Sequence, residues 1–233
     1  KEWSREHNGM VVNSPAEAAT DTDFVFTCVG NDDDIRSVLL EENGAFSGMK
    51  AGSTLIDHTT TSARVARELY GIAEKKKIGF LDGPVSGGQG GAEKGLLSVM
   101  VGGDKKIFEK AKPIINSYAK LVVRLGKSGS GQLGKMVNQI CIAGLLQALA
   151  EGLNFAKKAG LNGDQLLEVI SKGAAQSWQM ENRGRTMLSN QFDFGFAVNW
   201  MRKDLKYALE EAKKNNSLLP VTEIVDKYYG DVQ

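Results

Sequence analysis

The sequence predicts an α/β domain with a mostly parallel sheet, followed by an all-α domain. Up to about Arg124, short apolar runs alternate with helix-like stretches, the pattern of a parallel sheet that carries helices on both faces. After Gly131 this pattern ends, and a single helical register runs from Gln132 to Ala159. We therefore expect a first domain at residues 1–128 and a helical domain at residues 129–233.

Five short segments of the first domain are typical of β-strands. The first two, Asp23–Val29 and Ser53–Asp57, are so apolar that we expect both of their faces to be buried. The predicted strands span residues 23–29, 53–57, 78–82, 98–102 and 121–125.

Helices are predicted between these strands, and Ser62 is a suitable N-cap for one of them. In the second domain the long helix is apolar enough to be buried on more than one side. A loop rich in Gln and Asn is expected between the last two predicted helices. The predicted helices span residues 14–20, 35–40, 62–77, 105–119, 132–159, 163–172 and 201–215.

Composition excludes several classes of partner. The chain has 233 residues, 42% of them hydrophobic, and a formal net charge of +1, which argues against nucleic acid or an acidic membrane surface as the main partner. No uninterrupted apolar run approaches the roughly 20 residues that span a bilayer. Cys28 and Cys141 are expected to be buried, reduced thiols, which favours a cytosolic or organelle-matrix setting, and of these we expect the cytoplasm. With only His7 and His58, we expect no metal site.

Residues Gly129–Gly134 match the pattern G-x-G-x-x-G, but we reject a dinucleotide-binding motif here. That motif requires a second strand after the helix, with an acidic residue about 20 positions further on. The predicted helix instead runs past Glu151. A glycine-rich helix entry remains, and the sequence leaves two interpretations open: an interdomain hinge or a cradle for a carboxylate.

Three further features suit an enzyme that acts on a small hydroxy acid. Residues Asp82–Gly88 form a glycine-rich turn with a hydroxyl group, Lys135 and Asn138 share one face of the long helix, and Lys203 lies on another helix. Taken singly, each feature also has an ordinary explanation: a tight turn, a surface lysine or a solvent-facing charge pair.

Together and in this order, these motifs resemble those of the β-hydroxyacid dehydrogenase family, which includes 3-hydroxyisobutyrate dehydrogenase and tartronate semialdehyde reductase. The resemblance covers essentially the whole chain. It implies an incomplete Rossmann-type sheet, an oxidoreductase activity and NAD or NADP as the cofactor. The family's N-terminal dinucleotide fingerprint is missing, so the sequence does not decide between NAD and NADP, and this chain is expected to bind the cofactor poorly.

The resemblance also assigns roles to single residues. Lys135 would be the general acid/base, and Asn138 would orient the substrate. Gly30 stands where the family commonly has proline. The substrate carboxylate would be held by Ser86, Gly87 and Gly88. The cofactor would be contacted by Val29, Gly30, Thr60 and Lys203, the last across the domain cleft.

The predicted reaction is the interconversion of a small β-hydroxy acid and its semialdehyde. A segment with Trp178 and Met180 would close the substrate pocket with apolar groups, so 3-hydroxyisobutyrate ranks above tartronate semialdehyde and glyoxylate. One alternative is a 6-phosphogluconate dehydrogenase-like enzyme, with Arg183, Arg185 and Arg202 as candidate phosphate contacts. Another is a non-catalytic oligomerisation core. The family's dimers imply that the long helix joins a homodimer or homotetramer.

Overall fold

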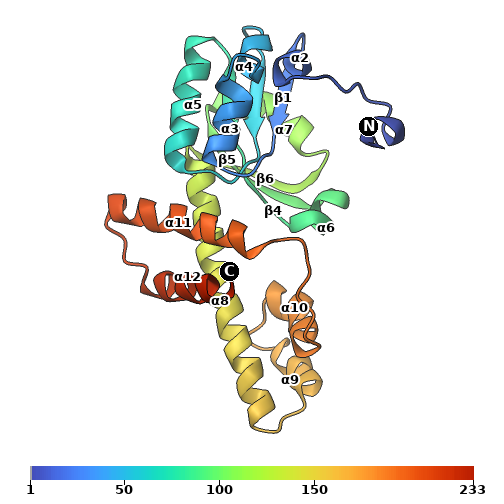
Figure 1. Cartoon of the computed structure of the whole chain (residues 1–233), viewed down its shortest axis with the longest axis vertical. Coiled ribbons are helices and arrows are strands. Elements are labelled where there is room, and N and C mark those ends of the chain that lie inside the picture. Colours follow the sequence, from blue (N-terminus) through green and yellow to red (C-terminus); the bar gives the residue numbers. More distant parts are fainter. Residues whose placement is uncertain (1) are drawn as a thin grey trace. The chain divides into compact units, whose positions relative to one another are not determined.

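The computed structural model describes residues 2–233. The chain divides into two compact units, Lys1–Lys135 and Met136–Gln233 (Figure 1). The first unit therefore extends beyond residue 128, where we expected the boundary. The first turn of the long helix is bonded to the loop that follows strand β2 (Thr54–Asp57) and to the last residue of strand β3 (Gly79–Asp82).

The first unit is built on a six-stranded mixed sheet with the order β1-β2-β3-β5-β4, in which β6 also pairs with β5. Strands β1, β2 and β3 are mutually parallel, as are β5 and β6, whereas β5 runs antiparallel to β3 and β4. All five predicted strands are confirmed. The additional strand, β4, has only two residues and thus no period to detect. The strands are β1 Phe24–Thr27, β2 Thr54–Asp57, β3 Gly79–Asp82, β4 Val85–Ser86, β5 Leu97–Gly103 and β6 Ala119–Gly126.

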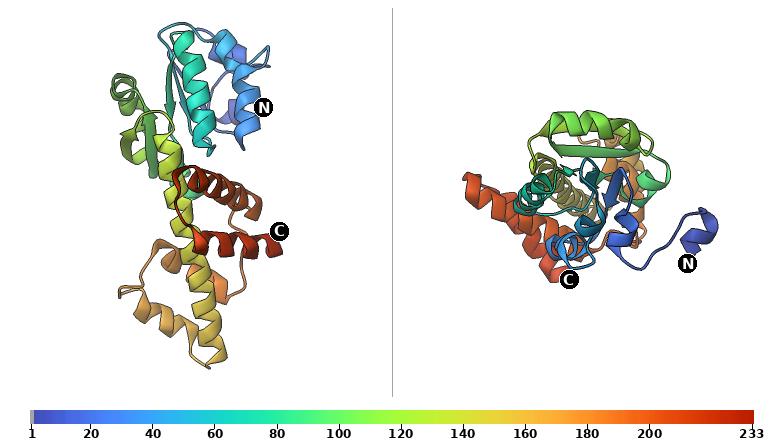
Figure 2. Two further views of the ribbon diagram at one scale, coloured as in Figure 1. Left: turned by 90° about the vertical axis from the view of Figure 1, so that its left-hand side faces the viewer. Right: turned by 90° about the horizontal axis from the view of Figure 1, so that it is seen from above.

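Side chains alternate across the sheet and build a separate core on each face. Leu55 and Phe80 pack with α3 and α5 on one face, and Ile56 and Leu81 pack with α7 on the other (Figure 2). Helices α4 and α6 were not predicted, because so few residues show no helical period. The helices of this unit are α1 Glu2–Glu6, α2 Pro15–Ala19, α3 Asp32–Leu40, α4 Ala45–Gly48, α5 Ala63–Lys75, α6 Gly88–Glu93 and α7 Lys105–Ile115.

The second unit is helical, and none of its described residues forms a strand. The long helix α8 carries two apolar clusters, one around Ala143 and Leu205 and one around Leu149 and Met180. The expected Gln- and Asn-rich loop is wrong in part, because Ser177 caps a helix there by accepting a hydrogen bond from the Met180 amide at 3.0 Å. The helices are α8 Ser130–Lys158, α9 Gly163–Ile170, α10 Trp178–Leu188, α11 Val198–Asn215 and α12 Pro220–Val232.

Two predictions of complete burial are wrong. Strand β1 lies at one end of the strand order, so Phe26 is 40% exposed and the following Cys28 is also exposed. Cys141 lies on a face of α8 that is not covered by the helices of its own unit, and its thiol is exposed as well. Neither cysteine forms a disulfide among the described residues.

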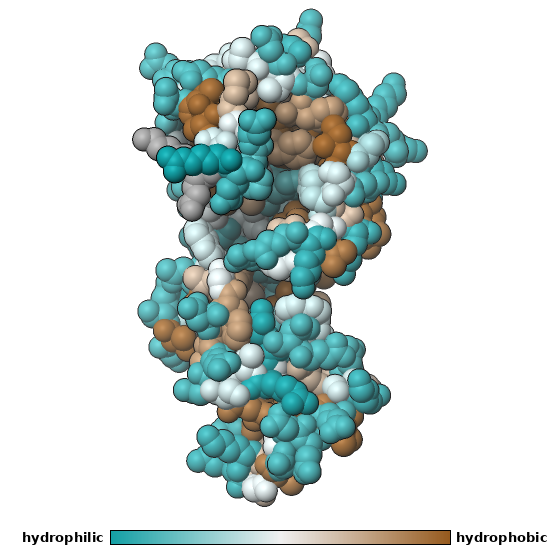
Figure 3. All heavy atoms as spheres, turned by 90° about the vertical axis from the view of Figure 1, so that its right-hand side faces the viewer, coloured by the Kyte–Doolittle hydropathy of each residue, from teal (hydrophilic) through white to brown (hydrophobic). Residues whose placement is uncertain are grey.

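The helical unit exposes many apolar side chains, visible as brown atoms among teal ones in the lower part of Figure 3. Among the described helices, α8 alone is long and apolar enough to cross a membrane, and 28% of its apolar window is buried in the chain. A core helix of a soluble protein meets the same criterion, so this observation is weak evidence for a membrane span. The large exposed apolar residues of this unit include Val137, Leu145, Phe155, Val169 and Trp178.

Candidate active site

The carboxyl ends of β1 and β2 lie side by side, since the two strands pair in parallel with Thr27 opposite Asp57. The Val29 amide donates a hydrogen bond to Thr59 Oγ1 at 3.0 Å, which joins the loops that follow these strands. Three predicted cofactor residues are thereby brought to one edge of the sheet, where open α/β sheets bind dinucleotides. They are Val29, Gly30 and Thr60.

Two buried carboxyl groups lie at the carboxyl ends of β2 and β3. Asp57 accepts hydrogen bonds from the Thr27 hydroxyl and the Thr59 amide, each at 3.0 Å, while its Oδ2 atom has no hydrogen-bond partner. Burial raises the pKa of Asp57 to about 6. Asp82, its neighbour in the β2–β3 register, is also buried, and burial likewise raises its pKa to about 6.

Asp82 caps the long helix from a distance. Its Oδ1 accepts from the Gly129 amide at 2.7 Å and its Oδ2 from the Gln132 amide at 3.1 Å. Gly131 lies so close that a Cβ atom there would meet the backbone oxygens of Asp82 and Met100 at 2.5 Å. The helix entry is therefore occupied by the chain's own carboxylate, which argues against the interpretation as a cradle for a ligand.

Gln132 ties the same helix turn to the loop after β2. Its side-chain Oε1 accepts from the Thr61 amide at 3.0 Å, and its Nε2 donates to the Thr59 carbonyl at 2.8 Å. Gln132 is fully buried, and Lys135, one turn further along, is only 8% exposed. The surface-lysine explanation for Lys135 is thus wrong, and its helix turn is fixed to the loop that contains Thr60.

Ser86 lies in β4 opposite Ser98 of β5. The chain then turns through Gly87 and Gly88, which have φ angles of +140° and +61°. Residues with a side chain rarely adopt these angles, so the turn into α6 depends on glycine. The predicted carboxylate-binding residues thus form one compact segment of the first unit.

His58 braces the loops that follow β2 and β3. Its Nδ1 lies 2.5 Å from the Gly83 carbonyl and its Nε2 lies 2.8 Å from the Tyr118 hydroxyl. Because a carbonyl can only accept, Nδ1 carries the hydrogen and Nε2 accepts from Tyr118. Burial lowers the pKa of His58, which favours this neutral form. Among the described residues, no three His, Cys, Asp or Glu side chains are grouped as a metal site.

In the second unit, Asn138 and Lys203 belong to one chain of polar contacts. Asn138 Nδ2 donates to Gln139 Oε1 at 2.8 Å, and Gln139 Nε2 donates to Asp204 Oδ2 at 2.7 Å. The other carboxylate oxygen of Asp204 lies 3.2 Å from Lys203 Nζ. Two residues with separate predicted roles are therefore connected through two buried side chains.

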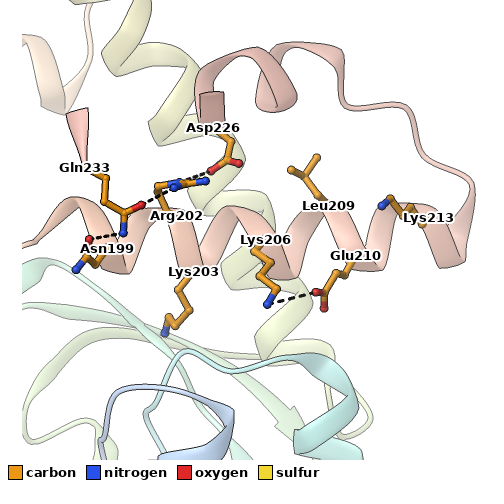
Figure 4. A pocket seen from close by; sticks show the side chains of 9 residues that line it. All are labelled: Asn199, Arg202, Lys203, Lys206, Leu209, Glu210, Lys213, Asp226 and Gln233. Carbon is orange, nitrogen blue, oxygen red and sulfur yellow. Dashed lines mark hydrogen bonds and ion pairs between the residues drawn. The ribbon is translucent and has the colours of Figure 1, made fainter. Parts of the chain in front are cut away.

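Lys203 also lies near two aromatic rings, 5.5 Å from the ring centre of Trp200 and 5.6 Å from that of Tyr207. It lines a hollow of about 450 Å³ on α11, in which Arg202 pairs with Asp226 at 3.3 Å (Figure 4). The solvent-facing charge pair that we considered for Lys203 is wrong, because its side chain is 16% exposed.

The other candidate pocket residues have partners within the helical unit. The Arg183 guanidinium lies 5.3 Å from the ring centre of Trp178 and 4.1 Å from that of Phe194. Arg185 pairs with Asp164 at 3.2 Å. Met180 is buried in the apolar cluster with Leu149, so it packs in the core of the helical unit.

The chain matches two family models in sequence. Residues 2–126 match the NAD-binding domain of 6-phosphogluconate dehydrogenase, and residues 129–233 match the NAD-binding model of NADP-dependent 3-hydroxyisobutyrate dehydrogenase. The chain belongs to the β-hydroxyacid dehydrogenase family. Both models describe NAD-binding domains of this family, which confirms NAD or NADP as the cofactor.

Relatives in the β-hydroxyacid dehydrogenase family agree with this assignment. An uncharacterized oxidoreductase of Shewanella frigidimarina is 58% identical over 100% of this chain and 80% of its own. The probable 3-hydroxyisobutyrate dehydrogenase-like 1 of Arabidopsis thaliana is 40% identical over 94% of this chain and 66% of its own. The structure of Mycobacterium tuberculosis 3-hydroxyisobutyrate dehydrogenase with L-serine is 27% identical, has a TM-score of 0.85, and is matched over 95% of this chain and 77% of its own.

Proposed function

We propose that the protein interconverts a small β-hydroxy acid and its semialdehyde. The observation that carries the proposal is the placement of Lys135, a nearly buried lysine whose helix turn is bonded to the loop with Thr60. A bound NAD or NADP supplies the hydride acceptor or donor. In the oxidising direction, the unprotonated amine of Lys135 takes the proton of the substrate hydroxyl, while a hydride leaves the carbon that carries this hydroxyl. In the reducing direction, the ammonium group returns the proton to oxygen.

The remaining predicted residues bind and orient. Asn138 orients the substrate hydroxyl, and Ser86, Gly87 and Gly88 hold the carboxylate through the Ser86 hydroxyl and the backbone amides of the turn. The cofactor is held on the side of the nicotinamide by Val29, Gly30, Thr60 and Lys203. The edge of the sheet at Val29 and Thr60 fits this role because it is formed by the carboxyl ends of two parallel strands.

The proposed substrate is a three- or four-carbon acid like 3-hydroxyisobutyrate. The match of residues 129–233 to a 3-hydroxyisobutyrate dehydrogenase model supports this choice. L-serine, which accompanies the Mycobacterium enzyme in its structure, is itself a three-carbon β-hydroxy acid, and this supports the same class. The apolar closure by Met180 no longer supports the ranking, since Met180 is buried in the core of the helical unit.

A 6-phosphogluconate dehydrogenase-like activity is the alternative that the match of residues 2–126 keeps open. A sugar phosphate needs cationic contacts, and the three arginines considered for it have other partners. Arg183 stacks on two rings, and Arg185 and Arg202 are paired with carboxylates. These contacts favour the smaller substrate.

We also propose that the protein is a homodimer or homotetramer in the cytoplasm. The exposed apolar residues of the helical unit, with Phe155 and Val169 each 72% exposed, support an interface there. Sedimentation velocity tests this part: a monomer at micromolar concentration would contradict it.

A substrate panel tests the function. kcat/KM is measured for 3-hydroxyisobutyrate, glycerate, L-serine and 6-phosphogluconate, each with NAD and with NADP. We expect 3-hydroxyisobutyrate to rank first. A preference of tenfold or more for glycerate, about 1.4 kcal/mol in transition-state binding, would overturn the ranking within the class. A preference for 6-phosphogluconate would overturn the class, and turnover of none would favour the non-catalytic oligomerisation core.

A further inference from the structure

A run of three hydrogen-bonded or ion-paired contacts connects the amide of Asn138 to the ammonium group of Lys203. The two side chains in the middle, Gln139 and Asp204, are 2% and 3% exposed. Most buried polar groups are hydrogen-bonded, and a change in one member of a run alters what its neighbour can bond, so the run acts as one unit. Neither middle residue has a role in the proposed reaction.

The chemistry of Asp204 fixes the direction of every bond in the run. A carboxylate can only accept, so Gln139 must turn its Nε2 toward Asp204. The amide of Gln139 is planar, and its Oε1 therefore faces Asn138 and accepts from Asn138 Nδ2. As a result, the Asn138 amide presents its Oδ1 acceptor on the side away from Gln139.

We propose that Gln139 and Asp204 are positioning residues, which fix the direction of the Asn138 amide and hold the Lys203 ammonium group. The proposal rests on the proposed function of Asn138 and Lys203. An acceptor at Asn138 suits the donors expected there, namely the hydroxyl group of the substrate and the ammonium form of Lys135. A reversed amide would present N–H groups to those donors.

Replacing the carboxylate by an amide removes the constraint at nearly constant shape. In the variant Asp204→Asn, residue 204 can donate as well as accept, so the side-chain amides of Gln139 and Asn138 can each rotate by about 180° and exchange their oxygen and nitrogen atoms. We expect kcat to fall by about tenfold or more while KM for the hydroxy acid changes less than about threefold. The control is Glu210→Gln, which removes a carboxylate of the same helix that lies 3.9 Å from Lys206 Nζ. A kcat for Asp204→Asn within about twofold of this control would overturn the proposal.

A double-mutant cycle tests the polarity without measuring activity. Asn138→Asp places a carboxylate opposite Gln139 Oε1, and Asp204→Asn relaxes the other end of the run. The double variant exchanges the two residue types, so Gln139 can reverse and satisfy both neighbours. We expect its loss of Tm to be smaller than the sum of the two single losses. Additive losses of Tm would contradict a fixed direction of the hydrogen bonds between Asn138, Gln139 and Asp204.

The two tests separate this proposal from the proposed function. Failure of the wild-type protein to turn over any hydroxy acid would refute the function, while the Tm cycle would still decide the polarity of the run. If Asp204→Asn does not fold, the double variant Asn138→Asp with Asp204→Asn is measured in its place. In that variant Gln139 can reverse and bond both neighbours, so we expect the double variant to fold. A double variant that also fails to fold would refute the proposal.

Discussion

The carboxylate of Asp82 accepts a hydrogen bond from the amide of Gly129, 47 residues further along the chain. An aspartate at a strand end thus serves as the cap of the helix that carries Lys135, a task that a neighbouring residue usually performs. Through the same carboxylate and the Gln132 amide, the first turn of α8 is fixed to the sheet. Lys135, the proposed acid/base group, is therefore placed by the fold of the first unit.

Asp82→Ala should destabilise the protein strongly. The substitution leaves the buried amides of Gly129 and Gln132 without an acceptor, and we expect a loss of about 2–4 kcal/mol in the free energy of unfolding. The control is Asp104→Ala, which removes the exposed local cap of α7 and should cost about 1 kcal/mol. Urea unfolding measures both, and equal losses would contradict the distant cap.

Gly131→Ala should be destabilising although alanine favours helices. Its Cβ would lie 2.5 Å from two backbone oxygens that cannot easily move, and we expect a cost of at least about 1–3 kcal/mol. In the same helix, Gly152 has open space around it, so Gly152→Ala should stabilise by up to about 1 kcal/mol. Thermal unfolding compares the pair, and a neutral Gly131→Ala would show that the helix is not packed this closely.

Asp57 should make stability fall as pH rises. Its pKa is about 6 in the folded chain, above the usual 3.8, so the folded state binds the proton more tightly than the unfolded state. The resulting stabilisation is complete below about pH 4 and is lost as pH rises through about 6. Relative to Asp57→Asn, the wild-type protein should lose roughly 1–3 kcal/mol between pH 4 and pH 7. A difference that is constant over this range, in urea titrations at several pH values, would contradict the shift.

The parts of the fold that sequence predicts well are those with a strong pattern. Buried runs such as Thr54–Asp57 and the long register of α8 are visible without a structure. The two-residue strand β4 is not, since a period needs several residues. The position of β1 at the end of the strand order also cannot be predicted from the sequence, because an apolar strand shows the same pattern whether or not its second face is covered.

The candidate catalytic residues were found by resemblance, but the residues that hold them were not. Gln132 and Gln139 interrupt an apolar helical register, and a pattern places such polar residues on the solvent side. In the structure both are buried, with partners 71 and 65 positions away in the sequence. Only the fold shows which distant groups satisfy them.

Lys135→Met tests the central claim most directly, since methionine keeps the length of the side chain and removes the amine. With the preferred β-hydroxy acid, we predict a fall in kcat of roughly 10²- to 10⁴-fold, the usual contribution of general acid–base catalysis. Cofactor affinity, measured by fluorescence titration, should stay nearly unchanged. The control is Lys157→Met, at the far end of the same helix, which should keep wild-type turnover. Wild-type kcat in Lys135→Met would contradict the account.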